Sequence, residues 1–262
     1  MDLKLQDKLA LVSGSTKGIG FAIAALLAAE GARVVINGRT DAAVREASDR
    51  IRSMTPRAKV EGFAGDLSAA GPTAEMVKRF PAVDILVNNL GIFERKVFEE
   101  IDDAEWQRFF DINVMSGVRL SRAYLPGMKK RNWGRIVFIS SESGIQIPDN
   151  MIHYGMTKTA QLAISRGLAE TCVGTNVTVN AVLPGPTLSD GNKAGIAKRS
   201  AGRPFAEFEK EFFEKVRPSS LLKRYTTVEE IATMVAYVCS PVSSATNGAA
   251  LRVDGGVVRA CF

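Results

Sequence analysis

Short apolar segments rich in β-branched residues alternate with longer segments of helical periodicity along the whole chain. The short segments are apolar at nearly every position, which is typical of strands covered on both faces. They predict seven strands, at 9–13, 33–37, 59–64, 84–88, 135–140, 178–183 and 250–253. Helical segments lie between them, at 19–30, 41–54, 73–79, 103–130, 154–172 and 227–239. Repeated strand and helix units predict an α/β fold around a parallel sheet with right-handed crossovers.

Two features depart from this regular alternation. Pro126 falls inside the long helix predicted at 103–130, where it is expected to bend or interrupt the helix. The stretch 184–225 is too long for a plain connection and is typical of a lid or binding loop. Part of that stretch is predicted to form an amphipathic helix, because apolar rings recur at helical spacing at Phe205, Phe208 and Phe212.

The composition indicates a globular protein, and the length of residues 1–262 fits one large α/β domain or two small ones. A chain of 262 residues with 46% hydrophobic residues can fill an ordinary core, which excludes a disordered or fibrous protein. Three cysteines and a single histidine indicate free thiols in a reducing compartment and leave no plausible zinc site. No secretory signal and no apolar run of membrane-spanning length is found, so we expect a soluble, cytoplasmic protein with no membrane partner.

The net charge of +6 is concentrated in one segment, because residues 191–225 contain nine Lys and Arg against four Glu. One interpretation is attraction of an acidic substrate, such as a keto acid, a phosphate ester or an acyl chain on an acidic carrier protein. The other is a solvated helix with weak surface pairs among Glu207, Lys210, Glu211, Glu214 and Lys215. Nucleic-acid binding is disfavoured, because aromatic stacking residues and a known binding module are absent.

A glycine-rich loop joins the first predicted strand to the first predicted helix. It reads Gly14, Ser15, Thr16, Lys17, Gly18, Ile19 and Gly20. Glycines let the backbone approach a pyrophosphate closely, and the helix amino terminus offers unpaired N–H groups and the positive end of a dipole. The loop therefore predicts a dinucleotide site, although a plain tight turn would have the same glycines.

Four further motifs follow in order: Asn88-Asn89-Leu90-Gly91, Tyr154-x-x-x-Lys158, Pro184-Gly185 and Val253-Asp254-Gly255-Gly256. With the glycine loop they resemble the short-chain dehydrogenase/reductase family over nearly the whole chain, and are similar to 3-oxoacyl-carrier-protein reductases. The resemblance implies a Rossmann-type, doubly wound, seven-stranded parallel sheet in a single domain, assembled as a homotetramer or homodimer. It also implies a substrate lid at 186–225 and further nicotinamide-cofactor contacts from Asn89, Gly91, Tyr154, Lys158, Pro184, Gly185, Thr187 and Ser189.

The choice of nicotinamide cofactor depends on the end of the second predicted strand. An acidic residue there accepts a hydrogen bond from the ribose 2′-hydroxyl of NAD, whereas basic residues pair with the 2′-phosphate of NADP. Here the strand ends in Arg39 without a carboxylate, and Lys17 resembles the family's other phosphate-binding position. These residues predict NADP(H), with NAD(H) left open if both are solvated surface charges. Asp66 and Leu67 resemble the pair that holds the adenine ring.

Tyr154 and Lys158 are four residues apart on a predicted helix, so their side chains project from one face. A phenol titrates at about pH 10, and we expect the ammonium and an oxidised nicotinamide to favour the phenolate. Tyr154 can then serve as general acid toward a ketone or general base toward an alcohol. By resemblance, Ser141 holds the substrate oxygen, with Ser140 and Ser143 as the alternatives, and Asn113 helps to fix a water that relays protons to the lysine.

Two neighbouring residues complete the predicted site. His153 is not given a catalytic role and is expected at the pocket rim or facing a partner subunit. Glu142 follows the catalytic serine and is either a substrate-binding carboxylate or a solvated loop charge. The sequence thus predicts an NADP(H)-dependent oxidoreductase that interconverts a small-molecule ketone and a secondary alcohol. Whether that substrate is acidic or carrier-bound is left open. An NAD-dependent dehydrogenase of a small hydroxy compound and a catalytically silent nucleotide-binding sensor are the alternatives.

Overall fold

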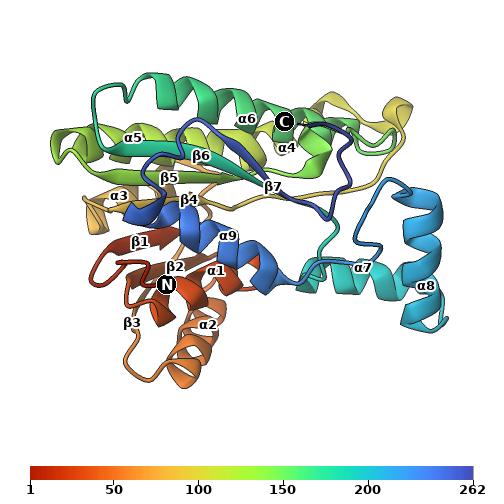
Figure 1. Ribbon diagram of the computed structural model, residues 1–262, viewed down its shortest axis with the longest axis horizontal. Helices are drawn as coiled ribbons and strands as arrows, with labels where there is room; N and C mark the ends of the chain where they lie inside the picture. Colours follow the sequence, from red (N-terminus) through yellow and green to blue (C-terminus); the bar gives the residue numbers. More distant parts are fainter. Residues whose placement is uncertain (262) are drawn as a thin grey trace.

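The computed structural model describes residues 1–261, and its centre is one seven-stranded parallel sheet (Figure 1). The strand order is β3-β2-β1-β4-β5-β6-β7, and every pair of neighbours is parallel. The strands are β1 (Leu9–Val12), β2 (Arg33–Gly38), β3 (Lys59–Ala64), β4 (Ile85–Asn88), β5 (Gly134–Ile139), β6 (Val177–Pro184) and β7 (Ala250–Val253). All seven predicted strands are confirmed, with ends that shift by one residue or less.

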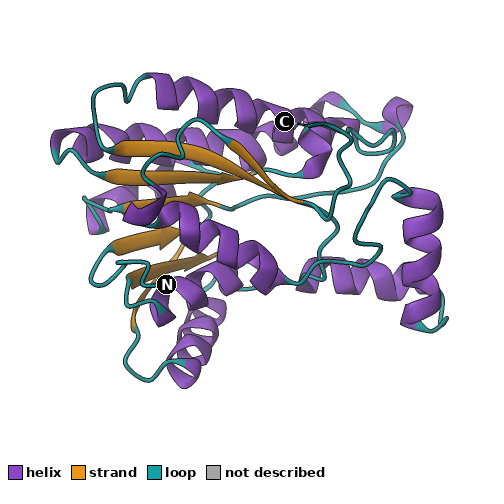
Figure 2. Cartoon of the chain, in the orientation of Figure 1, coloured by secondary structure: helices purple, strands orange, loops and turns teal. Residues whose placement is uncertain are grey.

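Helices cover both faces of the sheet (Figure 2). The apolar side chains of α1 (Gly18–Ala29), α2 (Asp41–Met54) and α9 (Val228–Cys239) pack into one hydrophobic core with strand residues. Those of α3 (Ala70–Arg79), α5 (Ser116–Lys130) and α6 (Ile152–Glu170) pack into a second core on the other face. This doubly wound arrangement explains why the strands are apolar throughout, since side chains of both orientations are buried. The Rossmann-type single domain predicted from the sequence is confirmed.

The order of the strands reverses between β1 and β4. The chain builds β1, β2 and β3 outward in one direction and then returns to place β4 on the other side of β1. The loops after these two strands therefore diverge at the carboxyl edge of the sheet, and ligands of open α/β sheets bind in the crevice that forms there. The glycine loop follows β1, and Asn89 follows β4.

The long predicted helix at 103–130 contains a π-helical turn. It comprises α4 (Asp103–Phe110), the π turn η2 (Asp111–Met115) and α5, which runs on through Pro126. The predicted interruption at Pro126 is therefore wrong, and the irregularity lies earlier, in the π turn that contains Asn113. Helix α3 begins three residues earlier than predicted, because Pro72 occupies its first turn, where a missing N–H costs nothing.

The stretch after β6 forms α7 (Asp190–Ser200), α8 (Phe205–Glu211) and the π turn η4 (Phe212–Val216). The expected amphipathic helix is confirmed as α8 with η4. These elements stand beyond the carboxyl ends of the strands in Figure 1 and have a small hydrophobic cluster of their own, formed by Ile196, Phe208, Phe212, Phe213 and Tyr225. Helix α7 was not predicted, because Ile196 is its only buried apolar residue.

Within residues 1–261, no helix is both long enough and apolar enough to cross a bilayer.

Candidate active site

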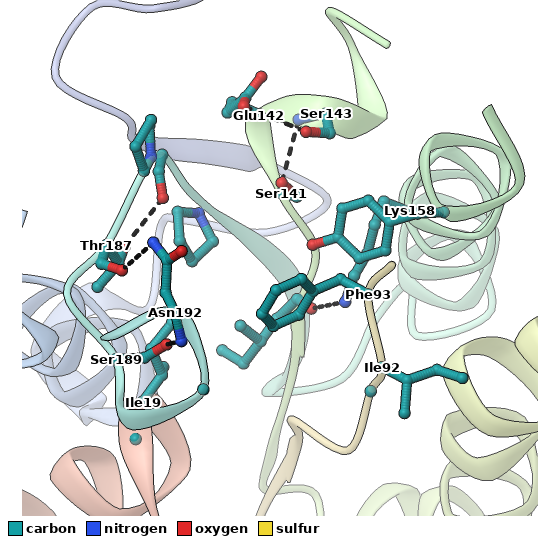
Figure 3. A pocket seen from close by; sticks show the side chains of 18 of the residues that line it. Ile19, Ile92, Phe93, Ser141, Glu142, Ser143, Lys158, Thr187, Ser189 and Asn192 are labelled. Carbon is teal, nitrogen blue, oxygen red and sulfur yellow. Dashed lines mark hydrogen bonds between the residues drawn. The ribbon is translucent and has the colours of Figure 1, made fainter. Parts of the chain in front are cut away.

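A cavity of about 550 Å³ lies at the carboxyl edge of the sheet. Its walls come from the glycine loop, the loop after β4, the end of β5, α6 and the segment after β6. In Figure 3, Thr187, Ser189 and Asn192 lie on one side, opposite Phe93 and Lys158. The cavity thus brings together the glycine loop and the predicted reacting groups, which are more than 120 residues apart in the sequence.

The glycine loop has the geometry of a phosphate-binding turn. Gly14 and Gly18 have φ values of 61° and 58°, a conformation that favours glycine. A Cβ on Gly20 would lie 2.4 Å from Asn89 Nδ2, so only glycine fits there. Asn89 Nδ2 in turn donates to the carbonyls of Ser13 and Gly14, both at 3.0 Å. The loop is therefore held open at the start of α1, and the residues present fit a dinucleotide pyrophosphate.

A carboxylate of the segment after β6 contacts this same loop. Gly18 N donates to Asp190 Oδ2 at 2.9 Å, across 172 residues of sequence. Asp190 is the first residue of α7, and Ser189 caps that helix by accepting from Asn192 N. Sequence reasoning missed Asp190, because no motif signals a contact between two loops.

The end of β2 carries the predicted determinants of cofactor choice. Lys17 and Arg39 are both exposed and, within residues 1–261, neither forms an ion pair. Leu67 is buried in the core below α3 and α5, and Asp66 Oδ1 accepts from Ser68 N and Oγ. Any contact of this pair with an adenine ring would therefore involve the Asp66 side chain or the backbone rather than the Leu67 side chain.

Tyr154 and Lys158 both line the cavity from the first turns of α6, and Lys158 Nζ lies 5.6 Å from the centroid of the Tyr154 ring. Lys158 Nζ donates to Ile139 O at 2.8 Å, so the end of β5 holds the lysine in place. Burial lowers the pKa of Lys158 to about 7 and raises the pKa of Tyr154 to about 12.

Removal from water disfavours the charged form of both groups in the protein without cofactor. The prediction of a phenolate concerns the site with an oxidised nicotinamide bound, and it stays a prediction. The smaller effect of the neighbouring Ser141 hydroxyl lowers the pKa of Tyr154, whereas Glu142 raises it further. A protonated phenol is the species needed to give a proton to a carbonyl oxygen.

Three serines at the end of β5 have different surroundings. Ser140 Oγ donates to Lys158 O at 2.8 Å and thereby joins the end of β5 to the backbone of α6. Ser143 Oγ donates to Glu142 Oε1 at 3.1 Å. Ser141 Oγ accepts from Ser143 N at 3.1 Å, which leaves its own proton free for a ligand in the cavity. Of the three, Ser141 has the geometry expected of the substrate-binding serine.

Asn113 lies in the π turn between α4 and α5 and is 1% exposed. Its amide clamps the loop after β4, because Oδ1 accepts from Ile92 N at 2.7 Å and Nδ2 donates to Ile92 O at 3.0 Å. Nδ2 also donates to Thr157 on α6, and the Asn113 carbonyl accepts from Gln161 Nε2. The π turn therefore connects three elements around Lys158, which agrees with the frequent occurrence of such turns at functional sites.

Glu142 lines the cavity and is only 4% exposed, so the interpretation as a solvated loop charge is wrong. Its Oε1 accepts from Arg217 Nε at 3.1 Å and Nη2 at 3.0 Å, and Arg217 lies at the end of the lid's π turn. Glu142 Oε2 is buried and has no hydrogen-bond partner within residues 1–261. Burial raises the pKa of this carboxyl, against the opposing effects of Arg217 and Ser143.

His153 is placed differently from the prediction. It is 0% exposed and packs edge-on against Phe109, with ring centroids 4.1 Å apart, and against Trp106. It lies in an aromatic cluster between α4 and α6 and lines neither the cavity nor an exposed face. The prediction of a rim or partner-facing position is wrong because a helix neighbour of Tyr154 points about 100° away, here into the core.

Comparison with known proteins adds to this geometry. The family model described as Enoyl-(Acyl carrier protein) reductase matches residues 14–258. The chain belongs to the short-chain dehydrogenase/reductase family. The Uncharacterized oxidoreductase YvaG of Bacillus subtilis is 49% identical, with 100% of both chains covered. The 3-oxoacyl-[acyl-carrier-protein] reductase FabG of Aquifex aeolicus is 31% identical, with 98% of this chain and 100% of the relative covered.

Among solved structures, L-sorbose reductase from Gluconobacter frateurii, complexed with NADPH and L-sorbose, superposes with a TM-score of 0.91. It is 30% identical, and the match covers 99% of this chain and 100% of that one. This short-chain dehydrogenase/reductase is therefore an NAD(P)-dependent oxidoreductase with the fold of such reductases. Motif reasoning missed the lining residues Arg95, Arg199, Arg217 and Tyr225, because they lie in segments without a motif.

Proposed function

We propose that this enzyme interconverts a ketone and a secondary alcohol with NADP(H), with Tyr154 as the general acid and base. The observation that carries the proposal is that one cavity holds Ser141, Tyr154 and Lys158 together with the glycine loop. When bound, the nicotinamide would supply the chemistry of hydride transfer to and from the carbonyl carbon. The Tyr154 phenol, which burial keeps protonated, donates a proton to the carbonyl oxygen as that oxygen gains charge.

The remaining residues orient these groups. Ser141 Oγ donates a hydrogen bond to the same carbonyl oxygen, since its acceptor side is already occupied by Ser143 N. Lys158, held by Ile139 O, is proposed to bind the cofactor and return a proton to Tyr154. Asn113 is proposed to help fix the water of that relay. Glu142 Oε2 is proposed to accept from a substrate hydroxyl.

The cofactor contacts are proposed from the motifs and their positions. The glycine loop, from Gly14 through Ser15, Thr16, Lys17, Gly18 and Ile19 to Gly20, would hold the pyrophosphate, and Asp66 and Leu67 the adenine. Asn89, Gly91, Pro184, Gly185, Thr187 and Ser189 would line the nicotinamide half. The unpaired cations Lys17 and Arg39 favour the 2′-phosphate of NADP.

The substrate class has two candidates with separate support. The L-sorbose reductase neighbour supports a polyhydroxylated ketone. The carrier-protein reductase relative supports a 3-oxoacyl thioester. The buried Glu142 favours the first, because a carboxylate acceptor suits hydroxyl groups rather than an acyl chain.

Tyr154→Phe tests the proposal. Purified protein is expected to consume NADPH with at least one ketone of a panel that contains L-sorbose and an acetoacetyl thioester. The variant is expected to lose that turnover by at least 1,000-fold, on the order of a general acid's contribution, and to bind NADPH as the wild type does. Turnover with NADH alone would favour the NAD-dependent alternative. NADPH binding without turnover of any ketone would contradict the proposal and indicate a nucleotide sensor.

We also propose that segment 186–225 is the substrate lid and that the enzyme is a cytoplasmic homotetramer or homodimer. The family resemblance supports the assembly, and the free thiols of Cys172, Cys239 and Cys261 support a reducing compartment. Light scattering on the purified protein measures the assembly directly, and a monomer at micromolar concentration would contradict it.

A further inference from the structure

Three arginines from different segments line the cavity. Arg95 lies in the loop after β4, Arg199 near the end of α7 and Arg217 after η4. The three arginines are far apart in the sequence. Arg199 and Arg217 belong to the lid, which brings both close to the loop that contains Arg95. Arg217 is neutralised, since its guanidinium makes two hydrogen bonds to Glu142 with side-chain exposures of only 12% and 5%.

The other two arginines have no carboxylate partner. Within residues 1–261, neither Arg95 nor Arg199 forms an ion pair, and the Arg95 side chain makes no hydrogen bond. The Arg199 side chain makes one long hydrogen bond, from Nη2 to Asn192 Oδ1 at 3.4 Å, and its guanidinium carbon lies 5.8 Å from the centroid of the Phe208 ring. Burial and the charges of Arg199 and Arg217 lower the pKa of Arg95, so both cations lie close enough to repel Arg95. The other carboxylate at the mouth, Glu94, is paired with Arg108 at 3.1 Å.

A buried neutral donor lies beside these cations. Tyr225 is 2% exposed, lines the cavity and has a hydroxyl without a hydrogen-bond partner within residues 1–261. Its ring stacks on Phe212 with centroids 5.0 Å apart, which fixes its direction. Burial raises the pKa of Tyr225 to about 12, while Arg199 and Arg95 oppose that rise, so the phenol remains a donor at neutral pH.

Four other basic residues of the lid form surface ion pairs. Arg203 and Lys215 pair with Glu211, Lys210 pairs with Glu214, and Arg224 pairs with Glu230. The expectation of surface pairs is therefore confirmed for Lys210 with Glu214 and for Lys215 with Glu211. Among the basic residues of the lid that form no ion pair within residues 1–261, Arg199 lines the cavity, whereas Lys193, Lys198 and Lys223 do not.

We propose that Arg95 and Arg199, with the Tyr225 hydroxyl, form an anion subsite that binds a carboxylate or phosphate group of the ketone substrate. Two guanidinium groups and a phenol are the donors that such groups accept in bidentate and charge-assisted hydrogen bonds. The subsite rests on the proposed function, since it selects the substrate of that reaction. It restricts the substrate to a small anionic ketone, whose hydroxyl groups face Glu142 and whose carbonyl faces Tyr154.

The first measurement is binding without turnover. D-gluconate, D-sorbitol 6-phosphate and neutral D-sorbitol share a six-carbon polyol chain, and calorimetry gives the affinity of each for the protein loaded with NADP⁺. At least one anion is expected to bind ten-fold or more tightly than D-sorbitol, and the stronger of the two identifies carboxylate or phosphate. Each of the variants Arg95→Gln and Arg199→Gln is expected to lower the ratio of the affinity for the anion to the affinity for D-sorbitol by about ten-fold. Lys198→Gln, beside Arg199 on α7 but outside the cavity lining, is the control and should leave it unchanged.

The second measurement is turnover of a matched pair. L-sorbose and 5-oxogluconate share the same ketone skeleton, and the acid has a carboxylate in place of one primary alcohol. The kcat/KM for the acid is expected to exceed that for the sugar and to fall about ten-fold in each arginine variant, while NADPH affinity and the kcat/KM for L-sorbose stay within two-fold.

The two measurements distinguish a failure of the anion subsite from a failure of the proposed reaction. Equal binding of all three polyols, or equal loss for acid and sugar in the variants, would overturn the anion subsite and leave the proposed reaction intact. Anion binding that depends on both arginines, with no turnover of either ketone, would support the subsite and contradict the proposed reaction. A third outcome is turnover of a 3-oxoacyl carrier-protein thioester alone, with Lys198→Gln reducing it as much as Arg95→Gln does. That result would indicate docking of the carrier protein on the surface and would overturn the small-anion subsite.

Discussion

Lys158 is a cation held in a place that disfavours its charge. It is 5% exposed, and its pKa falls from 10.5 to about 7. In the unfolded chain the amine binds a proton up to about pH 10, so between pH 7 and pH 10 the unfolded state binds more protons than the folded one. The contribution of Lys158 to the free energy of unfolding therefore rises with pH across that window. Below pH 7, the buried amine lowers the free energy of unfolding by its full amount.

Lys158→Met tests this directly. The variant is expected to be more stable than the wild type at pH 6, by a few kcal/mol at about 1.4 kcal/mol per unit of pKa shift, and to lose that advantage by pH 10. Denaturant unfolding of the cofactor-free protein at the two pH values gives the difference. Loss of catalysis accompanies the gain in stability, and a stability difference that is the same at both pH values would show that Lys158 is charged in the fold.

Arg39 belongs to the same scale, as an exposed side chain with a proposed phosphate partner. Removal of one charge-assisted hydrogen bond costs about 1.5–3 kcal/mol, so Arg39→Ala is expected to weaken NADPH binding by about ten- to 100-fold. NADH binding should change by less than two-fold, since NADH has no 2′-phosphate. Fluorescence titration with both cofactors measures this, and Arg45→Ala, an exposed arginine on α2, is the control. An unchanged NADPH affinity would remove Arg39 from the site.

At the scale of elements, α7 connects the lid to the glycine loop. Its first residue, Asp190, accepts from Gly18 N, one of the N–H groups that would face a pyrophosphate. With the pyrophosphate bound as proposed, a carboxylate there would compete for the donor and repel the phosphates. The position of α7 and the binding of cofactor would thereby be linked.

Asp190→Asn keeps the size of the side chain and removes its charge. The variant is expected to bind NADPH about three- to ten-fold more tightly, consistent with the about 1 kcal/mol of a charge near a helix amino terminus. Glu207→Gln, an exposed carboxylate on α8 of the same lid, should have no effect. Weaker binding in Asp190→Asn would mean that this carboxylate orders the loop for the cofactor.

At the scale of the whole molecule, the Glu142–Arg217 pair joins the lid to the sheet across 75 residues of sequence. Arg217 contributes two of the effects that lower the pKa of Glu142, although burial raises it overall. Loss of Arg217 would leave a buried carboxylate without its cation, which is costly wherever that carboxylate is ionised.

Arg217→Met is therefore expected to lower the free energy of unfolding by about 3 kcal/mol at pH 8. The loss should shrink as the pH is lowered, because burial raises the pKa of this carboxyl and the protonated form no longer needs the cation. Glu142→Gln combined with Arg217→Met should recover most of the stability at pH 8. A loss independent of pH, and not recovered by the double variant, would show that packing rather than charge holds the lid.

The elements were predictable where local pattern and tertiary environment agree. The buried strands are apolar throughout, since both faces are covered, and Phe205, Phe208 and Phe212 mark a helix that packs on its own cluster. Prediction failed for α7, where the stabilising interactions are the Ser189 cap and contacts to the loops. It failed at Pro126 as well, since packing of α5 against the sheet keeps the helix intact despite one missing hydrogen bond.

The sequence by itself determined the chemistry that depends on residue type and short spacing: the glycines of the loop, the four-residue separation of Tyr154 and Lys158, and the parallel strands that carry them. Such features are local, so one segment contains their whole physical cause. Only the tertiary structure decided which charges are compensated. It paired Glu142 with Arg217, placed Asp190 on Gly18, buried His153 and left Arg95 and Arg199 unpaired at the cavity. Electrostatic partners are set by distance in space and by exclusion of water, and neither is encoded in any one segment.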